Sequence, residues 1–430
     1  MAAGVALALL VTMFAGVRVL RPTDTVDPAH GSYPPATPAV AGLYGELLRT
    51  PLIVAGRLRV YGAANRVWAD GPVDAPMSTS AYWAFRRWPA QLVGVVVADD
   101  RIVVSQWSDG QLVALRAAEG RVAWRVNAGT RTAAYQGRRT GAKTVYAPPD
   151  LFTVTGDGHS LVVAVSPDTV TAVDADTGAV RWRRSIGVDP ACQEYFTTAG
   201  AVAAVNRCTQ PSTVDVYDAA TGNPRTWPAL GGATRPVGCA VGHSECTGLA
   251  GSASLEPASP GPVSPGPASS GPASPGPALP GWLIGPDGTL TAARGLSGAF
   301  SAGDRLVGRT VVRSGPDGQV RAYDAVTGAP RWSWPLDAAP VAGTRVVAVE
   351  PDRVHVVTQV HDMVTLELSS GRELSYFSGQ VKEDVRPWTP GYGYAARGYL
   401  VVERVQPDVP VDRPDSEYYF AVPSVLFAGS

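Results

Sequence analysis

Charged side chains are scarce in this sequence. They make up 17% of its 430 residues, and the formal net charge at pH 7 is −1. Nucleic-acid-binding proteins usually carry a basic face, so this balance argues against nucleic acid as a partner. Lysine occurs only at Lys143 and Lys382, and the sequence contains neither a glycine-rich phosphate loop nor a Gly-x-Ser-x-Gly elbow. The sequence therefore lacks these signatures of nucleotide binding and ester hydrolysis.

Long apolar runs are also scarce, and the one that occurs is at the N-terminus. Residues 1–17 read MAAGVALALLVTMFAGV, with Thr12 as their polar side chain, and Arg18 and Arg21 follow. This length is the short limit for a membrane span, and the run lacks a preceding basic segment and a following Ala-x-Ala cleavage site. We predict a single-pass transmembrane anchor or uncleaved signal over residues 1–20. The alternative is an ordinary buried helix.

The side of the membrane depends on charges around that run. Taken literally, the positive-inside rule keeps the C-terminal bulk inside, because the arginines follow the run. A true start upstream of Met1 would supply the missing positive charges, and on that basis we place the bulk on the extracytoplasmic side. Residues 21–50 are rich in Pro and Ala, which predicts a spacer between anchor and domain.

Cysteine is limited to four residues in two local pairs. Cys192 and Cys208 flank one strand-sized segment, and Cys239 and Cys246 are close neighbours. We predict two disulfides, which suit an oxidising compartment. Free thiols are one alternative. A metal site using Cys239, His243 and Cys246 is another, but it needs a fourth ligand, and the other histidines are scattered.

Sustained helical periodicity is also missing. The sequence instead has 47 glycines, 38 prolines and short valine-rich runs such as VGVVV and RVVAV, which predicts many short strands joined by turns. Residues 251–281 hold one charged residue, Glu256, and no aromatic residue. We predict that this Pro/Gly/Ser-rich stretch is a disordered or polyproline insertion inside one domain.

One turn segment recurs along the chain. The segment VDADTGAVRW at 173–182 returns as YDAVTGAPRW at 323–332. Each copy closes on a glycine, and these glycines are Gly120, Gly178, Gly222, Gly298, Gly328 and Gly371. In the three best copies an aspartate lies four residues earlier, at Asp174, Asp218 and Asp324. An aromatic residue follows the glycine, at Trp124, Trp182, Trp227, Trp332 and Tyr376.

A repeat of about 40 residues with several short strands is typical of a propeller blade. Residues 80–104 look like the last strand of one blade and the first of the next, and GYLVVERV and EYYFAVPSVLFAG look like closing strands. We predict an all-β propeller over residues 51–430. It would have seven or eight four-stranded blades, and we favour eight.

The Asp-x-x-Thr-Gly turn has a catalytic interpretation and a structural one. Aspartic proteases need two facing Asp-Thr-Gly loops in a different fold, whereas here the motif recurs at repeat spacing and drifts to AEG, LSG and SSG. We therefore predict hairpin turns, with the aspartate accepting amide hydrogen bonds and the glycine taking a positive φ. The tryptophans are expected to pack between neighbouring blades.

VTAVDADTGAVRW and VRAYDAVTGAPRW resemble the repeat of the pyrroloquinoline-quinone (PQQ)-like β-propellers, roughly Ala-x-Asp-x-x-Thr-Gly-x-x-x-Trp. The resemblance covers about residues 93–378 and implies the propeller fold. It also implies that the protein is an assembly scaffold or extracytoplasmic sensor, as most bacterial carriers of the repeat are. Quinoprotein dehydrogenases resemble one another in adjacent cysteines, a calcium held by Glu and Asn, and a catalytic Asp.

This sequence has no Cys-Cys pair and only four asparagines, Asn65, Asn127, Asn206 and Asn223. We therefore predict no catalytic, cofactor-binding or metal-binding residues, and treat His159 and His361 as polar residues on or beside strands. The expected function is a non-catalytic extracytoplasmic platform for an envelope protein, peptide or glycan. The alternatives are a PQQ-dependent oxidoreductase with an atypical site and a ligand-sensing ectodomain that works with a membrane partner.

Overall fold

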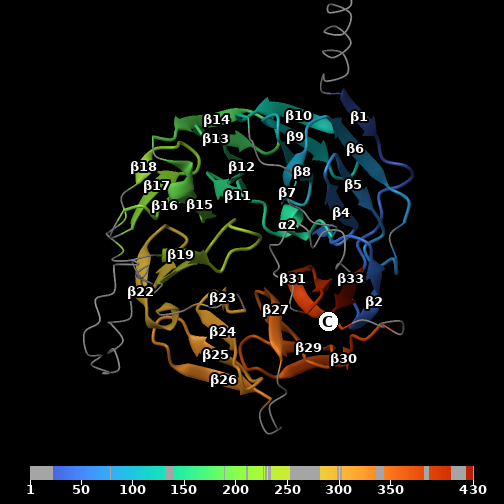
Figure 1. Ribbon diagram of the computed structural model, residues 1–430, viewed down its shortest axis with the longest axis vertical. Coiled ribbons are helices and arrows are strands. Elements are labelled where there is room, and N and C mark those ends of the chain that lie inside the picture. The colour runs from blue at the N-terminus through green and yellow to red at the C-terminus, as the bar shows by residue number, and fades with distance from the viewer. Residues whose placement is uncertain are drawn as a thin grey trace, which may run out of the picture.

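The chain forms a closed ring of eight β-sheets around a central axis (Figure 1). We describe it from a computed structural model. The residues that the structure describes are 23–77, 79–130, 135, 140–187, 189–209, 212–225, 227, 230, 234–251, 281–297, 300, 303–335, 343–381, 387–407 and 423–429. The ring confirms an all-β propeller and decides the blade number in favour of eight.

The first four blades follow one another along the chain. Blade 1 contains β1 (Thr23–Asp27), β3 (Leu52–Val54), β4 (Leu58–Ala63), β5 (Arg66–Asp70) and β6 (Trp83–Trp88). Blade 2 contains β7 (Leu92–Ala98), β8 (Ile102–Trp107), β9 (Gln111–Arg116) and β10 (Val122–Asn127). Blade 3 contains β11 (Leu151–Gly156), β12 (His159–Val165), β13 (Thr169–Asp174) and β14 (Val180–Ser185). Blade 4 contains β15 (Gln193–Thr198), β16 (Ala201–Asn206), β17 (Thr213–Asp218) and β18 (Pro224–Arg225).

The other four blades complete the ring. Blade 5 contains β19 (Thr234–Val237), β20 (Gly248–Gly251), β21 (Gly281–Ile284) and β22 (Leu290–Ala293). Blade 6 contains β23 (Arg305–Val307), β24 (Thr310–Ser314), β25 (Val320–Asp324) and β26 (Pro330–Trp334). Blade 7 contains β27 (Arg345–Glu350), β28 (Arg353–Val357), β29 (Asp362–Glu367) and β30 (Glu373–Ser378). Blade 8 contains β31 (Thr389–Ala396), β32 (Tyr399–Val405), β33 (Ser424–Ala428) and β2 (Gly42–Leu47).

The valine-rich runs form the inner strands of the blades. Every residue of β8 and β16 is buried, because a blade packs against a neighbour on each of its two faces. The outer strand β14 alternates instead, with Trp182 buried between exposed arginines. Among the described residues, seven apolar clusters fill the spaces between consecutive blades, and the largest of these joins blades 8, 1 and 2. The hydrophobic core is therefore a ring of blade interfaces.

The ring closes through a strand from near the start of the chain. β2 pairs antiparallel with β33, with Leu47 opposite Ser424, and β1 adds a fifth strand to blade 1 beside β6. Leu47 is fully buried. Both strands lie within residues 21–50, where the sequence predicts a spacer. That boundary is corrected, because these segments contribute strands to the propeller.

Two predicted segments fall largely outside the described residues. The expected anchor at residues 1–20 is one, and residues 252–280 of the proline-rich insertion are the other. β20 and β21, which flank the insertion, are hydrogen-bonded neighbours, so it interrupts a single blade. In the described part of the chain, no helix has the length and apolar character of a membrane span.

Candidate functional site

The recurring aspartates organise the turns between the third and fourth strands of their blades. Asp174 Oδ1 accepts hydrogen bonds from the amide and the hydroxyl of Thr177, at 3.0 and 2.8 Å. Its second oxygen accepts from the guanidinium of Arg181 at 2.6 Å. Asp218 and Asp324 have the same arrangement with their own Thr and Arg partners. Both oxygens of each carboxylate therefore accept hydrogen bonds from residues of the same hairpin.

These contacts lower the pKa of the turn carboxylates. Burial alone would raise the pKa of Asp174, but the hydrogen bonds from Arg181 and Thr177 outweigh it and bring the pKa to about 2. The pKa of Asp324 is also lowered, and the largest cause is the hydrogen bond that its carboxylate accepts from the amide of Thr327. A general acid at neutral pH needs a raised pKa. The turn aspartates are instead held as carboxylates.

The hairpin glycines Gly178 and Gly222 each receive an indole from the preceding blade. A Cβ added at Gly178 would lie 2.6 Å from Cγ of Trp124, and one added at Gly222 would lie 2.7 Å from the ring of Trp182. The indole nitrogens of these tryptophans donate to the carbonyls of Ala175 and Ala219, at 2.8 and 2.7 Å. The glycine therefore has two functions: it takes a positive φ and leaves room for the ring.

The same joint occurs at two other places. Trp332 packs on Gly371, and its indole donates to Leu368 O at 2.8 Å. Trp83 packs on Gly120 and donates to Ala117 O at 2.7 Å. Sequence reasoning missed Trp83, because the loop before it lacks the Asp-x-x-Thr-Gly pattern. One signal could have found it. In the other joints the indole of one blade packs on the glycine of the next, so Gly120 in blade 2 calls for a tryptophan in blade 1.

Other copies of the repeat depart from this joint. Trp227 packs partly buried against the cluster that contains Phe196 and Leu249, whereas the side chain of Tyr376 is 55% exposed. Gly298 lies outside the described residues. Blade 5 ends with β22 and the short 3-10 helix η2 (Arg294–Leu296). There, the amide of Gly295 donates to Ala325 O at 2.9 Å, in the position where an indole donates elsewhere.

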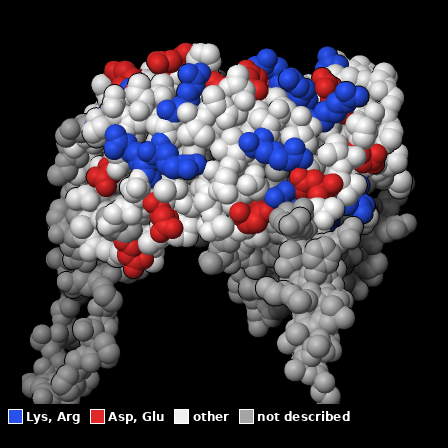
Figure 2. Space-filling model, turned by 90° about the horizontal axis from the view of Figure 1, so that it is seen from above, with Lys and Arg blue, Asp and Glu red and all other residues white. Residues whose placement is uncertain are grey.

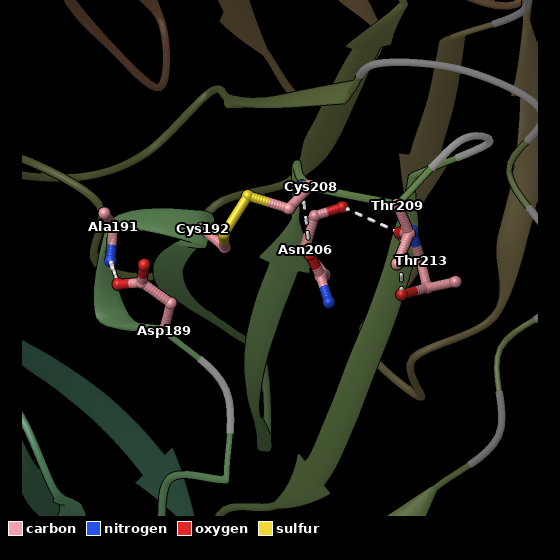
Figure 3. The surroundings of a disulfide bond; sticks show 7 residues. All are labelled: Asp189, Ala191, Cys192, Asn206, Cys208, Thr209 and Thr213. Atoms are coloured by element: carbon pink, nitrogen blue, oxygen red, sulfur yellow. Dashed lines mark hydrogen bonds between the residues drawn. A yellow bond between two sulfur atoms is a disulfide. The ribbon is translucent and has the colours of Figure 1, made fainter.

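Both predicted cysteine pairs are disulfide-bonded in the structure. Cys192–Cys208 ties the 3-10 helix η1 (Pro190–Cys192) to the end of β16 (Figure 3). Cys239–Cys246 closes the base of the β19–β20 connection. Because the sulfurs of Cys239 and Cys246 are bonded to each other, they supply no thiolate for a metal site with His243.

Two segments fill the centre of the ring. The short helix α2 (Ala142–Tyr146) lies at the centre and contacts β4, β7 and β31 (Figure 1). Residues 238–247, the channel loop, enter from blade 5. His243 O accepts from Thr197 N at 2.9 Å, and Ser244 Oγ accepts from Thr153 N at 3.0 Å. The channel loop thus reaches the inner strands of blades 4 and 3.

A buried carboxylate connects the α2 segment to blade 8. Glu403 on β32 has no exposed surface. Its Oε1 accepts from Thr140 Oγ1 at 2.5 Å, and its Oε2 accepts from Tyr392 N at 3.1 Å. These bonds join residues far apart in the sequence. Because an unpaired buried carboxylate is costly, they hold the segment before α2 in one position.

Two cavities of opposite charge border the filled centre. The larger, about 760 Å³, lies among blades 6, 7 and 8 and includes Arg305 and Arg345. The smaller, about 290 Å³, lies among blades 1, 2, 3 and 8 and includes Asp99, Asp100 and Glu245. Burial raises the pKa of Glu245, and the nearby charge of Asp99 adds to the effect. We refer to them as the arginine cavity and the acidic cavity.

A comparison with known protein families identifies this arrangement. The model of the family described as outer membrane protein assembly factor BamB matches residues 74–241 and 289–376, more than half of the chain. The chain belongs to this family. The matched segments begin in blade 1 and end in blade 7, with the proline-rich insertion between them. No curated protein matches the chain.

Solved structures similar to this BamB-family chain include natural and designed propellers. BamB from Moraxella catarrhalis is 14% identical, with 91% of this chain and 99% of that chain covered and a TM-score of 0.42. The computationally designed Ika8 protein is 11% identical, with 90% and 100% covered and a TM-score of 0.47. The C-terminal WD40 domain of Sif2 is 12% identical, with 92% and 100% covered and a TM-score of 0.42.

The alternative of a quinone cofactor calls for a calcium site, which can be compared with the described residues of this BamB-family chain. None of their His, Cys, Asp and Glu side chains form a group of three that could hold a metal ion. In the acidic cavity, Asp100 pairs with Arg397, and the pKa of Glu245 is raised. We therefore derive no chemistry through a quinone, and the expected absence of a cofactor stays a prediction.

The two histidines considered from sequence lie apart from both cavities. His159 is 59% exposed, with Nδ1 3.8 Å from Oδ2 of Asp174. His361 stacks on Trp388 at 3.9 Å between ring centroids, and its Nε2 lies 3.0 Å from Trp388 O. Neither residue lines either cavity. The charged side chains of the two cavities belong instead to Arg305, Arg345, Asp99, Asp100 and Glu245.

Proposed function

We propose that this chain is a non-catalytic protein-interaction platform of the bacterial cell envelope, with the propeller on the extracytoplasmic side. The observation that carries the proposal is membership of a family described as an assembly factor. The two disulfides are consistent with an oxidising compartment. The apolar run at residues 1–17 would supply the attachment to the membrane.

The architecture suits a platform for two physical reasons. The Trp–Gly joints and the closing β2–β33 pair hold the blades in one arrangement, so a partner would meet a preformed surface. The channel adds two cavities of opposite charge, which would favour one orientation of the partner.

The rim is less suited to charge-based recognition than the channel. On the side drawn in Figure 2, groups of Lys and Arg alternate with groups of Asp and Glu. Several rim arginines have carboxylate partners: Arg125 lies 3.0 Å from Asp24, and Arg181 lies 2.6 Å from Asp174. In these pairs the charge of the arginine is largely balanced by a carboxylate of the same chain, which leaves less charge for a partner to recognise.

The proposal is tested by cross-linking in the native host. The full chain, tagged at its C-terminus, is cross-linked in intact cells and purified under denaturing conditions. An unrelated propeller with the same anchor and tag is the control. We expect specific envelope proteins attached to the chain and absent from the control. Identical cross-linked sets from the two baits would contradict the proposal.

Two further measurements test its other parts. Protease added to intact cells should cleave the 251–281 insertion if the propeller is outside, and cleavage that requires lysis would contradict that location. Purified full chain is also mixed with PQQ and calcium. Saturable quinone absorbance together with alcohol oxidation would overturn the non-catalytic assignment.

A further inference from the structure

The arginine cavity has the size and lining of a binding site. It lies where the innermost strands β23, β27 and β31 begin, and its volume of about 760 Å³ is within the usual range for ligand pockets. Glycines occupy five of its lining positions, at 303, 315, 343, 391 and 393. A Cβ at Gly393 would lie 2.3 Å from Val347 O, so β31 and β27 approach closely at one wall.

Two arginines line this cavity, and no acidic residue is among the described residues of its lining. The nearby charge of Asp304, outside the lining, acts on Arg305. The guanidinium of Arg305 is held by hydrogen bonds to Asp304 O at 3.0 Å and Val347 O at 3.5 Å. Arg345, the first residue of β27, is exposed. The planar guanidinium of an arginine can donate two parallel hydrogen bonds to a carboxylate or a phosphate.

The rest of the lining favours an organic chain over a small ion. Pro316, Val346, Val347 and Pro390 give the cavity apolar walls, and Tyr392 adds an aromatic side chain. A free phosphate or carboxylate ion would leave these walls and most of the volume unfilled. A peptide that carries carboxylates between apolar side chains would satisfy both kinds of surface.

The acidic cavity adds a constraint on the partner. β31 borders both cavities, with Tyr392 at the arginine cavity and Tyr394 at the acidic one. Asp99 and Glu245 line the smaller cavity, and none of the described residues in its lining is basic. A negatively charged segment is therefore attracted to one cavity and repelled from the other.

We propose that the arginine cavity binds an acidic segment of a partner protein, with carboxylates on Arg305 and Arg345 and apolar side chains against the walls. This inference rests on the proposed function, because it supplies the chemistry by which the platform would recognise its partner.

The test uses the purified full chain and a short dye-labelled peptide of alternating glutamate and leucine. A peptide with glutamine in place of glutamate is the matched probe. We expect saturable anisotropy for the glutamate peptide, weakened by salt, and much weaker binding of the glutamine peptide. Equal binding of the two peptides would overturn the proposal.

Charge reversal in the protein locates the site. Arg345→Glu should weaken binding of the glutamate peptide by about tenfold or more, because repulsion replaces a charge-assisted hydrogen bond. Arg309→Glu is the control: Arg309 follows the other end of β23, is 66% exposed and lies outside the cavity lining. Equal weakening by the two variants would show a general charge effect and refute the site.

Further measurements distinguish binding of an acidic segment from binding of small anions. Arg345→Lys should retain part of the affinity, since the charge stays while the paired hydrogen bonds are lost. Complete displacement of the peptide by inorganic phosphate at a concentration similar to that of the peptide would assign the cavity to small anions.

In cells, loss of a cross-linked partner from Arg345→Glu alone supports the inference. Equal partner recovery by wild type and Arg345→Glu refutes the inference and leaves the platform function standing. A wild-type chain without partners refutes the platform function, whatever the peptide assay shows.

Discussion

The joint between blades 2 and 3 can be tested by adding one methyl group. In Gly178→Ala, the new Cβ would lie 2.6 and 2.7 Å from Cγ and Cβ of Trp124. Real Cβ atoms do not approach other atoms so closely, so the indole or the turn must move. The indole is also fixed by its hydrogen bond to Ala175 O at 2.8 Å.

Two costs add in this variant. Gly178 has φ of +77°, and an L-residue in that conformation costs about 1–2 kcal/mol. Overpacking against a fixed side chain costs about 1–3 kcal/mol. We therefore expect Gly178→Ala to lower the free energy of unfolding by about 2–5 kcal/mol.

Blade 6 supplies the control for the backbone cost. Gly328 occupies the same turn position with φ of +74°, but the nearest atom to an added Cβ is Gly295 N at 3.7 Å. Gly328→Ala should therefore cost only about 1–2 kcal/mol. Urea unfolding followed by circular dichroism measures both variants, and the difference between them isolates the contact with Trp124.

A double-mutant cycle tests the assignment further. In a Trp124→Gly background both contacting atoms, Cγ and Cβ of Trp124, are absent, so adding Gly178→Ala should cost only as much as Gly328→Ala does in the wild type. If Gly178→Ala and Gly328→Ala destabilise equally in the wild type, the indole does not constrain the glycine, and the proposed joint is wrong.

Three further predictions concern the turn, the channel loop and ring closure. Asp174→Asn should lower the free energy of unfolding at neutral pH by about 1–2 kcal/mol through loss of the charge pair with Arg181. Folding lowers the pKa of Asp174 from 3.8 to about 2, so the wild-type advantage is complete above about pH 4 and disappears as the pH falls toward 2, which urea titrations over that range will show. Replacing Cys239 and Cys246 with serine should cost about 2 kcal/mol and speed amide exchange in the channel loop, and unchanged exchange would mean that other contacts hold the loop. Leu47→Ala should cost about 2–5 kcal/mol and expose β2 to limited proteolysis, whereas wild-type resistance would show that closure does not depend on this side chain.

The repeat was readable from sequence because its determinants are local. Asp174 and Gly178 lie within one hairpin, and their backbone needs follow from turn chemistry alone. The valine-rich runs likewise require burial on both faces. Blade type, the propeller class and the preference for eight blades followed from these features. These local features could not show that Gly295 takes the place of an indole beside blade 6.

Closure and the channel required contacts between residues far apart in the chain. The segment of β2, GLYGEL, has little strand character of its own and becomes a strand because β33 supplies hydrogen-bonding partners. Cavity composition was equally hidden, because Arg305, Arg345 and Tyr392 come from three different blades. Sequence spacing carries no information on which inner-strand side chains meet across the axis.

The sequence by itself determined the local hairpins, the buried strand faces and hence the blades, since each depends on residues a few positions apart. Tertiary structure decided how the ring closes, what fills its centre and which charges face each cavity. The bond between Thr140 and Glu403 illustrates the difference. It forms because the completed ring brings blade 8 beside the α2 segment, and a buried carboxylate then requires the hydroxyl placed next to it.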